Sequence, residues 1–94
     1  MTTYPRESVI ERKVCDKATA DGWYVRKYTT PARRAAPDRI FIKDGRVVFI
    51  EFKRDEDMGP TPAQARELQA LREAGVEAYC CGSVRSALAL LGID

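Results

Sequence analysis

The sequence has no histidine among its 94 residues. That absence excludes Ser-His-Asp and Cys-His nucleophile systems, histidine-ligated zinc and imidazole general bases. A catalytic site in this chain must therefore use carboxylates, lysine, hydroxyls or a metal ion held by oxygen ligands. The three cysteines, Cys15, Cys80 and Cys81, are odd in number and form no C-x-x-C pair, which argues against a disulfide scaffold or a zinc knuckle.

Long apolar runs and a strong net charge are also missing. No apolar run approaches the ~20 residues of a membrane helix, and the first seven residues lack the apolar core of a signal peptide, so we expect a cytoplasmic protein with no membrane partner. Sixteen Lys and Arg against 14 Asp and Glu leave a net charge of only +2, and the basic excess lies in residues 1–36. The length and an apolar fraction of 45% predict one folded domain, residues 1–94.

Helical and strand patterns alternate along the chain. Ile10, Val14 and Ala18 recur at helical spacing, and Asp44-Gly45 is a strong hairpin signal because both central residues of a type I′ turn need positive φ. The predicted elements are a helix over Pro5–Ala20, strands over Trp23–Tyr28, Arg39–Lys43 and Arg46–Lys53, a helix from Pro62 to Ala74, a strand over Val76–Cys81, and a last helix after Ser83.

The predicted order is α-β-β-β-α-β-α. Thr61 followed by Pro62 and Gln64 predicts a capping box at the start of the second helix. A strand, a crossover helix and a second strand imply a parallel pair, while the hairpin strands run antiparallel. The fold class is therefore α/β, with a mixed central sheet flanked by helices.

Two carboxylates and a lysine are expected to meet at one end of the hairpin. Residues two apart on a strand share a face, so Glu51 and Lys53 project together while Phe52 points to the opposite, packed face. The turn at Asp44-Gly45 brings Asp38 back alongside Glu51. Carboxylates with a backbone carbonyl form an oxygen site for Mg²⁺ or Mn²⁺, and a neighbouring lysine can orient a water or stabilise charge on a phosphate.

Simpler interpretations exist for the same residues. E-x-K alone is often an opposite-charge pair on a solvated strand face. Glu11 lies on the apolar side of the first helix, with Glu7 four residues earlier on the same side. Both could also be ordinary acidic residues near a helix N-terminus, where negative charge is favoured.

Together these residues resemble the PD-(D/E)XK nuclease superfamily, and within it the virus-type replication-repair nuclease (VRR-Nuc) family. The resemblance extends over nearly the whole chain. The segments that carry it are Glu7-Ser8-Val9-Ile10-Glu11, Lys27-Tyr28-Thr29-Thr30-Pro31 with Arg33-Arg34, Pro37-Asp38-Arg39-Ile40, Val48-Phe49-Ile50-Glu51-Phe52-Lys53 and Thr61-Pro62-Ala63-Gln64. It implies a restriction-endonuclease-like core, similar to that of Holliday-junction resolvases.

The resemblance also implies a role for each matching residue. Asp38 and Glu51 would bind the metal with the backbone carbonyl of Phe52, and Lys53 would be the catalytic lysine. Glu11 would be a further catalytic residue, because it matches the glutamate on the first helix of the resolvases, with Glu7 as the alternative. Gln64 matches a glutamine near the site and would support it. The residues expected to contact DNA phosphates are Lys27, Arg33, Arg34 and Arg39.

The expected function is therefore a Mg²⁺- or Mn²⁺-dependent endonuclease in phage or bacterial replication or repair. Its expected substrate is branched DNA such as four-way junctions, and it would need no small-molecule cofactor. A homodimer is expected because such a short domain is marginal alone and a junction has two strands to cut. Two alternatives stay open: a catalytically silent domain of this fold that binds nucleic acid or a protein, and an RNA-processing enzyme.

Overall fold

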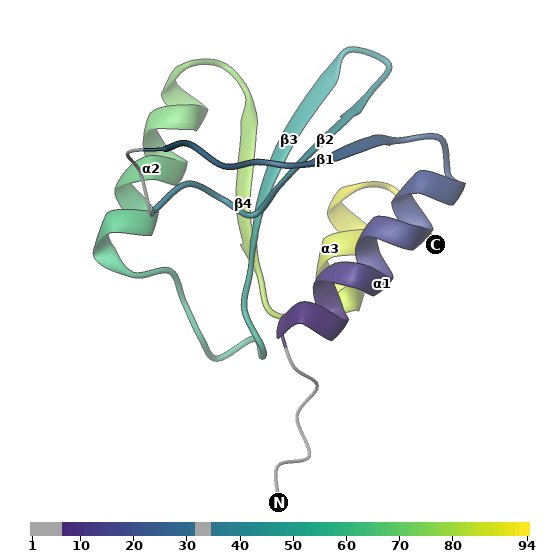
Figure 1. Ribbon diagram of the computed structural model, residues 1–94, viewed down its shortest axis with the longest axis horizontal. Coiled ribbons are helices and arrows are strands. Elements are labelled where there is room, and N and C mark those ends of the chain that lie inside the picture. The colour runs from purple at the N-terminus through teal and green to yellow at the C-terminus, as the bar shows by residue number, and fades with distance from the viewer. Residues whose placement is uncertain (1–6, 32–34) are drawn as a thin grey trace, which may run out of the picture.

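One four-stranded sheet with helices on both faces forms the framework of the protein (Figure 1). The structure, a computed structural model, describes residues 7–31 and 35–94. The elements are α1 (Glu7–Ala20), β1 (Tyr24–Lys27), β2 (Arg39–Lys43), β3 (Arg46–Phe52), α2 (Pro62–Glu73), β4 (Glu77–Cys81) and α3 (Val84–Leu90). The predicted class and element order are confirmed.

The sheet is mixed, with strand order β1-β2-β3-β4. Strands β1 to β3 pair antiparallel, and β3 pairs parallel with β4 through the crossover helix α2. At the hairpin tip, Asp44 and Gly45 have φ of 49° and 83°, as the predicted turn requires. The register pairs Arg39 with Ile50, which puts Asp38 opposite Glu51 one step further along.

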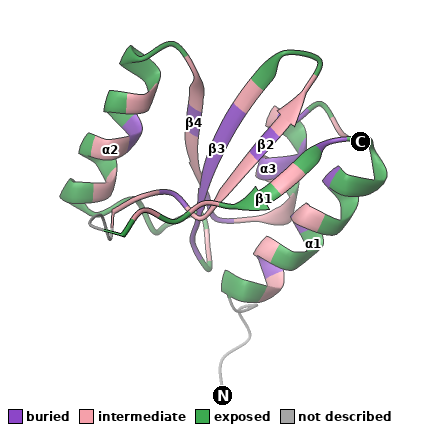
Figure 2. Ribbon diagram, turned by 45° about the horizontal axis from the view of Figure 1, so that its top comes forward, coloured by how far each residue is buried: buried purple, intermediate pink, exposed green. Residues whose placement is uncertain are grey.

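Each face of the sheet is covered by different helices. Helices α1 and α3 pack on one face, where Ile10, Val14 and Ala18 of α1 join a buried cluster with Val48 and Phe52 of the sheet. Helix α2 packs on the other face through Leu68, which contacts a smaller cluster containing Phe49 and Ala78. Strand β3 lies between both layers and is buried over most of its length (Figure 2).

The predicted element ends are accurate to one or two residues. Trp23 and Tyr28 lie just outside β1 and Val76 just before β4, while Pro5, the predicted start of the first helix, lies outside the described residues. Lys53 follows the last residue of β3, yet its N–H still donates to the Cys81 carbonyl at 2.8 Å. Within the described part of the chain, no helix is long and apolar enough to cross a membrane.

Candidate active site

The end of the β2–β3 hairpin holds Asp38 close to the end of β3. The Tyr28 N–H donates to the Asp38 carbonyl at 3.0 Å, which ties the residue to the chain after β1. The Phe52 N–H donates to the Asp38 side chain (Oδ2) at 2.8 Å. These bonds fix the carboxylate beside Glu51, where the predicted register puts it.

Glu51 and Lys53 extend from β3 toward α2, while the Phe52 ring packs in the α1–α3 cluster. Both charged residues are largely buried, with 5% of Glu51 and 9% of Lys53 exposed. The Lys53 ammonium lies 3.9 Å from Glu51 Oε2. Ion pairs on solvated strand faces are exposed, so the burial of this pair argues against that simpler interpretation.

Gln64, in the first turn of α2, connects the two residues. Its Nε2 donates to Glu51 Oε2 at 3.0 Å, and its Oε1 accepts from Lys53 Nζ at 2.8 Å. The same Oε1 accepts from the Thr61 N–H at 2.9 Å, and Thr61 Oγ1 accepts from the Gln64 N–H, which completes the predicted capping box. One amide thus caps α2 and orients the charged side chains of Glu51 and Lys53 at the end of β3.

A third carboxylate reaches this point from α1. Oxygens of Glu7, Asp38 and Glu51 all lie within 4.8 Å of one another. Three carboxylates at such distances match the oxygen ligands that Mg²⁺ and Mn²⁺ bind. The donor set therefore fits a hard divalent cation, and it lacks the nitrogen and sulfur ligands typical of structural zinc.

Burial, with repulsion from neighbouring carboxylates, raises the pKa values of all three acids. Burial raises the pKa of Glu51 to about 7, and the nearby Asp38 charge adds to the effect while Lys53 opposes it. Burial is also the main cause of the raised pKa values of Asp38 and Glu7. A bound cation would stabilise the ionised forms of these acids. Raised pKa values in a group of neighbouring carboxylates are therefore what we expect at a metal site without its ion.

The pKa of Glu51 leads to a prediction about stability without metal. An acid whose pKa is raised in the folded state adds stability below its unfolded pKa, and that stability is lost as the pH rises through the folded pKa. We therefore expect the melting temperature of the metal-free protein to fall by a few degrees between about pH 5 and pH 8. The chain has no histidine to titrate in this range. Glu51→Gln should flatten the dependence in a calorimetric pH series, and an equally steep slope in that variant would contradict the assignment.

Glu11, the second helix carboxylate, is bound elsewhere. Its Oε2 accepts from Arg39 Nε at 2.5 Å, an interaction that also raises the pKa of Arg39. Arg39 begins β2 on the face that α1 covers, which it shares with Phe41 of the α1–α3 cluster, whereas Asp38 immediately precedes the strand. The structure therefore places Glu7 in the acid cluster and Glu11 in an ion pair beside it.

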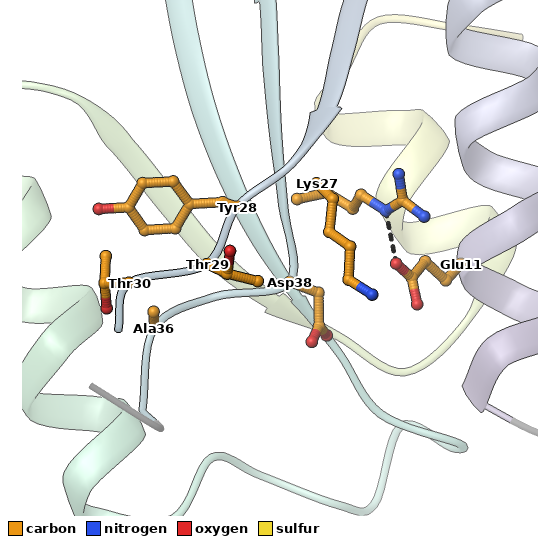
Figure 3. Close-up of a pocket in the computed structure, with 8 residues that line it drawn as sticks. Glu11, Lys27, Tyr28, Thr29, Thr30, Ala36 and Asp38 are labelled. Carbon is orange, nitrogen blue, oxygen red and sulfur yellow. Dashed lines mark hydrogen bonds and ion pairs between the residues drawn. The ribbon is translucent and has the colours of Figure 1, made fainter. Parts of the chain in front are cut away.

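A polar cavity of about 400 Å³ opens next to Asp38. Figure 3 shows the side chains of Lys27 and Asp38 extending into the same space beside Glu11, whose bond to Arg39 is dashed. Lys27 is exposed and Arg39 only partly so. Of the basic residues expected at DNA, these two border the cavity, while Arg33 and Arg34 lie outside the described residues.

Comparisons with known proteins find similar solved structures and one similar curated protein. A solved structure described as "VRR_NUC domain" superposes with a TM-score of 0.84 at 30% identity, covering 92% of this chain and 94% of that one. A second, "VRR_NUC domain protein", has the same TM-score at 17% identity over 96% and 88% of the two chains, which supports the fold alone. "Putative nuclease p44" of Acyrthosiphon pisum secondary endosymbiont phage 1 is 35% identical over 63 residues, or 66% of this chain and 67% of that protein. No protein-family model matches the chain.

Proposed function

The chain belongs to the VRR-Nuc family, and from that premise we propose that it is a divalent-metal-dependent endonuclease of DNA formed by one domain. Family membership and the phage relative named as a nuclease support the nuclease activity. The observation that carries the metal dependence is the grouping of Glu7, Asp38 and Glu51 within 4.8 Å of one another, beside a buried lysine.

In this proposal Asp38 and Glu51 bind Mg²⁺ or Mn²⁺, together with the backbone carbonyl of Phe52. Glu7 supports the site from α1, and Glu11 acts one step away by holding Arg39. The bound ion would polarise the scissile phosphate and lower the pKa of a water molecule. It would thereby activate the water in a chain that has no histidine to act as an imidazole base. The Phe52 N–H bond to Asp38 orients one carboxylate in advance, and the Gln64 amide orients the other.

Lys53 is the proposed catalytic cation. Its ammonium donates a hydrogen bond to Gln64 Oε1 at 2.8 Å and lies 3.9 Å from the Glu51 carboxylate, which holds it in place. An ammonium has three N–H donors, so another can donate to a phosphate oxygen or to the attacking water. Because the lysine is already desolvated and oriented, it can stabilise developing negative charge at little reorganisation cost.

The proposed substrate is branched DNA, which the protein would bind through the phosphates. The proposed location is the cytoplasm. Lys27 and Asp38 line the same cavity, so a phosphate backbone bound at Asp38 could also contact the Lys27 ammonium. Contacts of this kind position a strand without reading its bases, which suits recognition of DNA structure over sequence.

Cleavage of a defined substrate panel tests this function. A four-way junction, a linear duplex of the same sequence and a tRNA are incubated with and without Mg²⁺. We expect nicking of the junction only when Mg²⁺ is present, with slower cleavage of the duplex. Preferential cleavage of tRNA would favour an RNA-processing enzyme, and binding without cleavage in the presence of Mg²⁺ would favour a catalytically silent domain.

Arg33 and Arg34 are two predicted DNA contacts that are adjacent in the chain, shortly before Asp38. Replacing both with alanine should weaken binding to all DNA sequences alike and reduce the salt slope of the binding constant by up to ~2, since fewer counterions are released. Fluorescence anisotropy over a salt series measures the slope. Alanine at Lys43 and Arg46 is the control, because these two form ion pairs with Asp21 and Glu77 near the hairpin tip. An unchanged slope in the Arg33/Arg34 variant would contradict phosphate contact.

We further propose that the protein acts as a homodimer. Tyr24 exposes 51% of its surface on the edge strand β1, and the Arg26 guanidinium stacks 4.1 Å from its ring centre. A two-fold pair could cut both strands of a junction. Light scattering at tens of micromolar protein should give twice the monomer mass, and a monomer at that concentration would rule the dimer out.

A further inference from the structure

The segment that follows Lys53 rests on the turn between β4 and α3. This turn consists of Gly82, which is buried, and Ser83, the N-cap of α3. In Figure 1 the chain leaving β3 runs beside the end of β4 before it turns toward α2. The contacts at this crossing involve residues 55 and 56, only two and three positions after the proposed catalytic lysine.

Gly82 allows an unusually close approach of backbone. A Cβ built on Gly82 would lie 2.1 Å from the Asp55 carbonyl oxygen, 2.2 Å from its carbon and 2.6 Å from the Glu56 nitrogen. Real Cβ atoms essentially never come within 3.0 Å of such atoms. The φ of Gly82 is not in the positive range, so an alanine here would be excluded by space and not by its backbone conformation.

Hydrogen bonds hold the same contact in place. The Glu56 carboxylate accepts from Ser83 Oγ at 2.6 Å and from the Gly82 N–H at 3.3 Å. On its other side, Asp55 closes a turn by accepting from the N–H groups of Asp57 and Met58. The bonds to Ser83, Ser86 and Gly82 lower the pKa of Glu56, so the acceptor is ionised over the neutral range.

Lys53 therefore lies between two fixed points of the backbone. Before the crossing, the Lys53 N–H donates to the carbonyl of Cys81, which is the residue before Gly82. After the crossing, residues 55 and 56 are seated against Gly82 itself. Relief of a 2.1 Å contact requires a backbone shift of about 1 Å, and misplacement on this scale can cost about 10²-fold in rate.

We propose that Gly82 is a positioning residue for Lys53, because the space left by its missing side chain seats residues 55–56 and so fixes the backbone from which Lys53 reaches the acid cluster. The proposal rests on the proposed nuclease function. It adds a residue from the β4–α3 turn that touches neither substrate nor metal and acts only through the lysine.

A double-mutant comparison tests it by single-turnover cleavage of a four-way junction in Mg²⁺. We expect Gly82→Ala to lower the rate by about 10- to 100-fold in the natural chain, and by less than about twofold when Lys53→Met is already present. A merely structural defect would instead lower the rate by the same factor in both backgrounds. Affinity for Mg²⁺ should change by less than about twofold, since the acidic ligands lie outside the displaced segment.

Two further variants keep the test decisive. Gly59→Ala is the matched control in the same loop, because a Cβ there meets nothing within 4 Å and its φ is not positive, so its rate should equal that of the natural chain. If Gly82→Ala fails to fold, Glu56→Ala replaces it, since Glu56 is exposed and its loss removes only the bonds to the turn. We expect a loss of about 3- to 10-fold that disappears in the Lys53→Met background.

The outcomes separate the two proposals. The positioning role alone would be overturned if Gly82→Ala folds and cleaves at the natural rate. It would also be overturned if Gly82→Ala lowers the rate by the same factor with and without Lys53→Met. If Gly82→Ala is unfolded and Glu56→Ala leaves the cleavage rate unchanged, the positioning role is likewise overturned. A Lys53→Met protein that cleaves at the natural rate would instead overturn the proposed function.

Discussion

Replacing Lys53 with methionine should lower the single-turnover rate of junction cleavage by at least ~10²-fold, the usual scale for losing a positioned electrostatic or proton-transfer group. Methionine has similar length and no charge, so it can occupy the same space between Glu51 and Gln64. It removes no metal ligand. Calorimetric titration should therefore give Mg²⁺ affinity at least as high as before, because a neighbouring positive charge is gone.

Lys43→Met is the matched control for this substitution. Lys43 lies at the other end of β2, where its ammonium bonds to the Asp21 carbonyl and carboxylate at 2.6 and 3.1 Å. Loss of such a half-exposed ion pair should cost at most ~1 kcal/mol of stability and leave the cleavage rate unchanged. If Lys53→Met folds and also cleaves at the natural rate, Lys53 is only another structural ion pair.

Local sequence signals were sufficient to predict most of the fold. The Asp44-Gly45 turn fixes the hairpin register, and that register brings Asp38 opposite Glu51. The alternation of a strand then separates Glu51 and Lys53 from Phe52 without any knowledge of the remaining chain. Thr61, Pro62 and Gln64 likewise determine where α2 begins, since the capping box depends on a four-residue pattern.

Long-range pairings at the site were not predicted. Helical phase alone puts Glu7 and Glu11 on one side of α1 and cannot say which of them lies at the sheet end. The Arg39–Glu11 ion pair, between residues 28 apart, decides the arrangement. A usable signal did exist: Arg39 lies two residues before the apolar Phe41 on the predicted strand, so the two share a face, and Phe41 packs in the cluster that contains α1.

The second role of Gln64 and the role of Gly82 were missed for different reasons. Gln64 was predicted to cap its helix and to lie near the site. Its bonds to Glu51 and Lys53 were missed because they depend on the distance between the start of α2 and the end of β3, which local sequence does not determine. Gly82 has no turn signature in the sequence, because its importance comes from a backbone crossing with residues 55 and 56 rather than from a positive φ. Contacts of this type arise only when two distant segments are packed.

The acid cluster is assembled from both layers that enclose the sheet. Helix α1 supplies Glu7, β3 supplies Glu51, the residue just before β2 is Asp38, and α2 supplies the amide that orients Glu51. Glu51 is buried, Asp38 half-buried and Glu7 exposed, and the pKa values of all three are raised, so the charged cluster is costly to hold together at neutral pH. This cost is relieved when a cation binds, and it predicts that removing one acid stabilises the metal-free protein while damaging its activity.

Asp38→Asn is the sharpest test of that argument. The asparagine carbonyl can still accept from the Phe52 N–H, so the fold should persist, and loss of one negative charge should raise the melting temperature of the metal-free protein at neutral pH. Mg²⁺ affinity should fall at least ~10-fold and the cleavage rate at least ~10³-fold, because a ligand and its charge are lost together. Higher Mn²⁺ should restore part of the rate, since Mn²⁺ binds oxygen and nitrogen ligands more strongly.

The control for Asp38→Asn is the same chemical change at Asp21, which pairs with Lys43 far from the cluster. Asp21→Asn should leave Mg²⁺ affinity and cleavage unchanged and should not stabilise the metal-free protein. The measurements are calorimetric Mg²⁺ titration, thermal unfolding with and without Mg²⁺, and single-turnover cleavage. The joint pattern of higher metal-free stability, weaker Mg²⁺ binding and lost cleavage is specific to a cation site. A folded Asp38→Asn protein that binds Mg²⁺ and cleaves as the natural chain does would show that the three carboxylates do not form one.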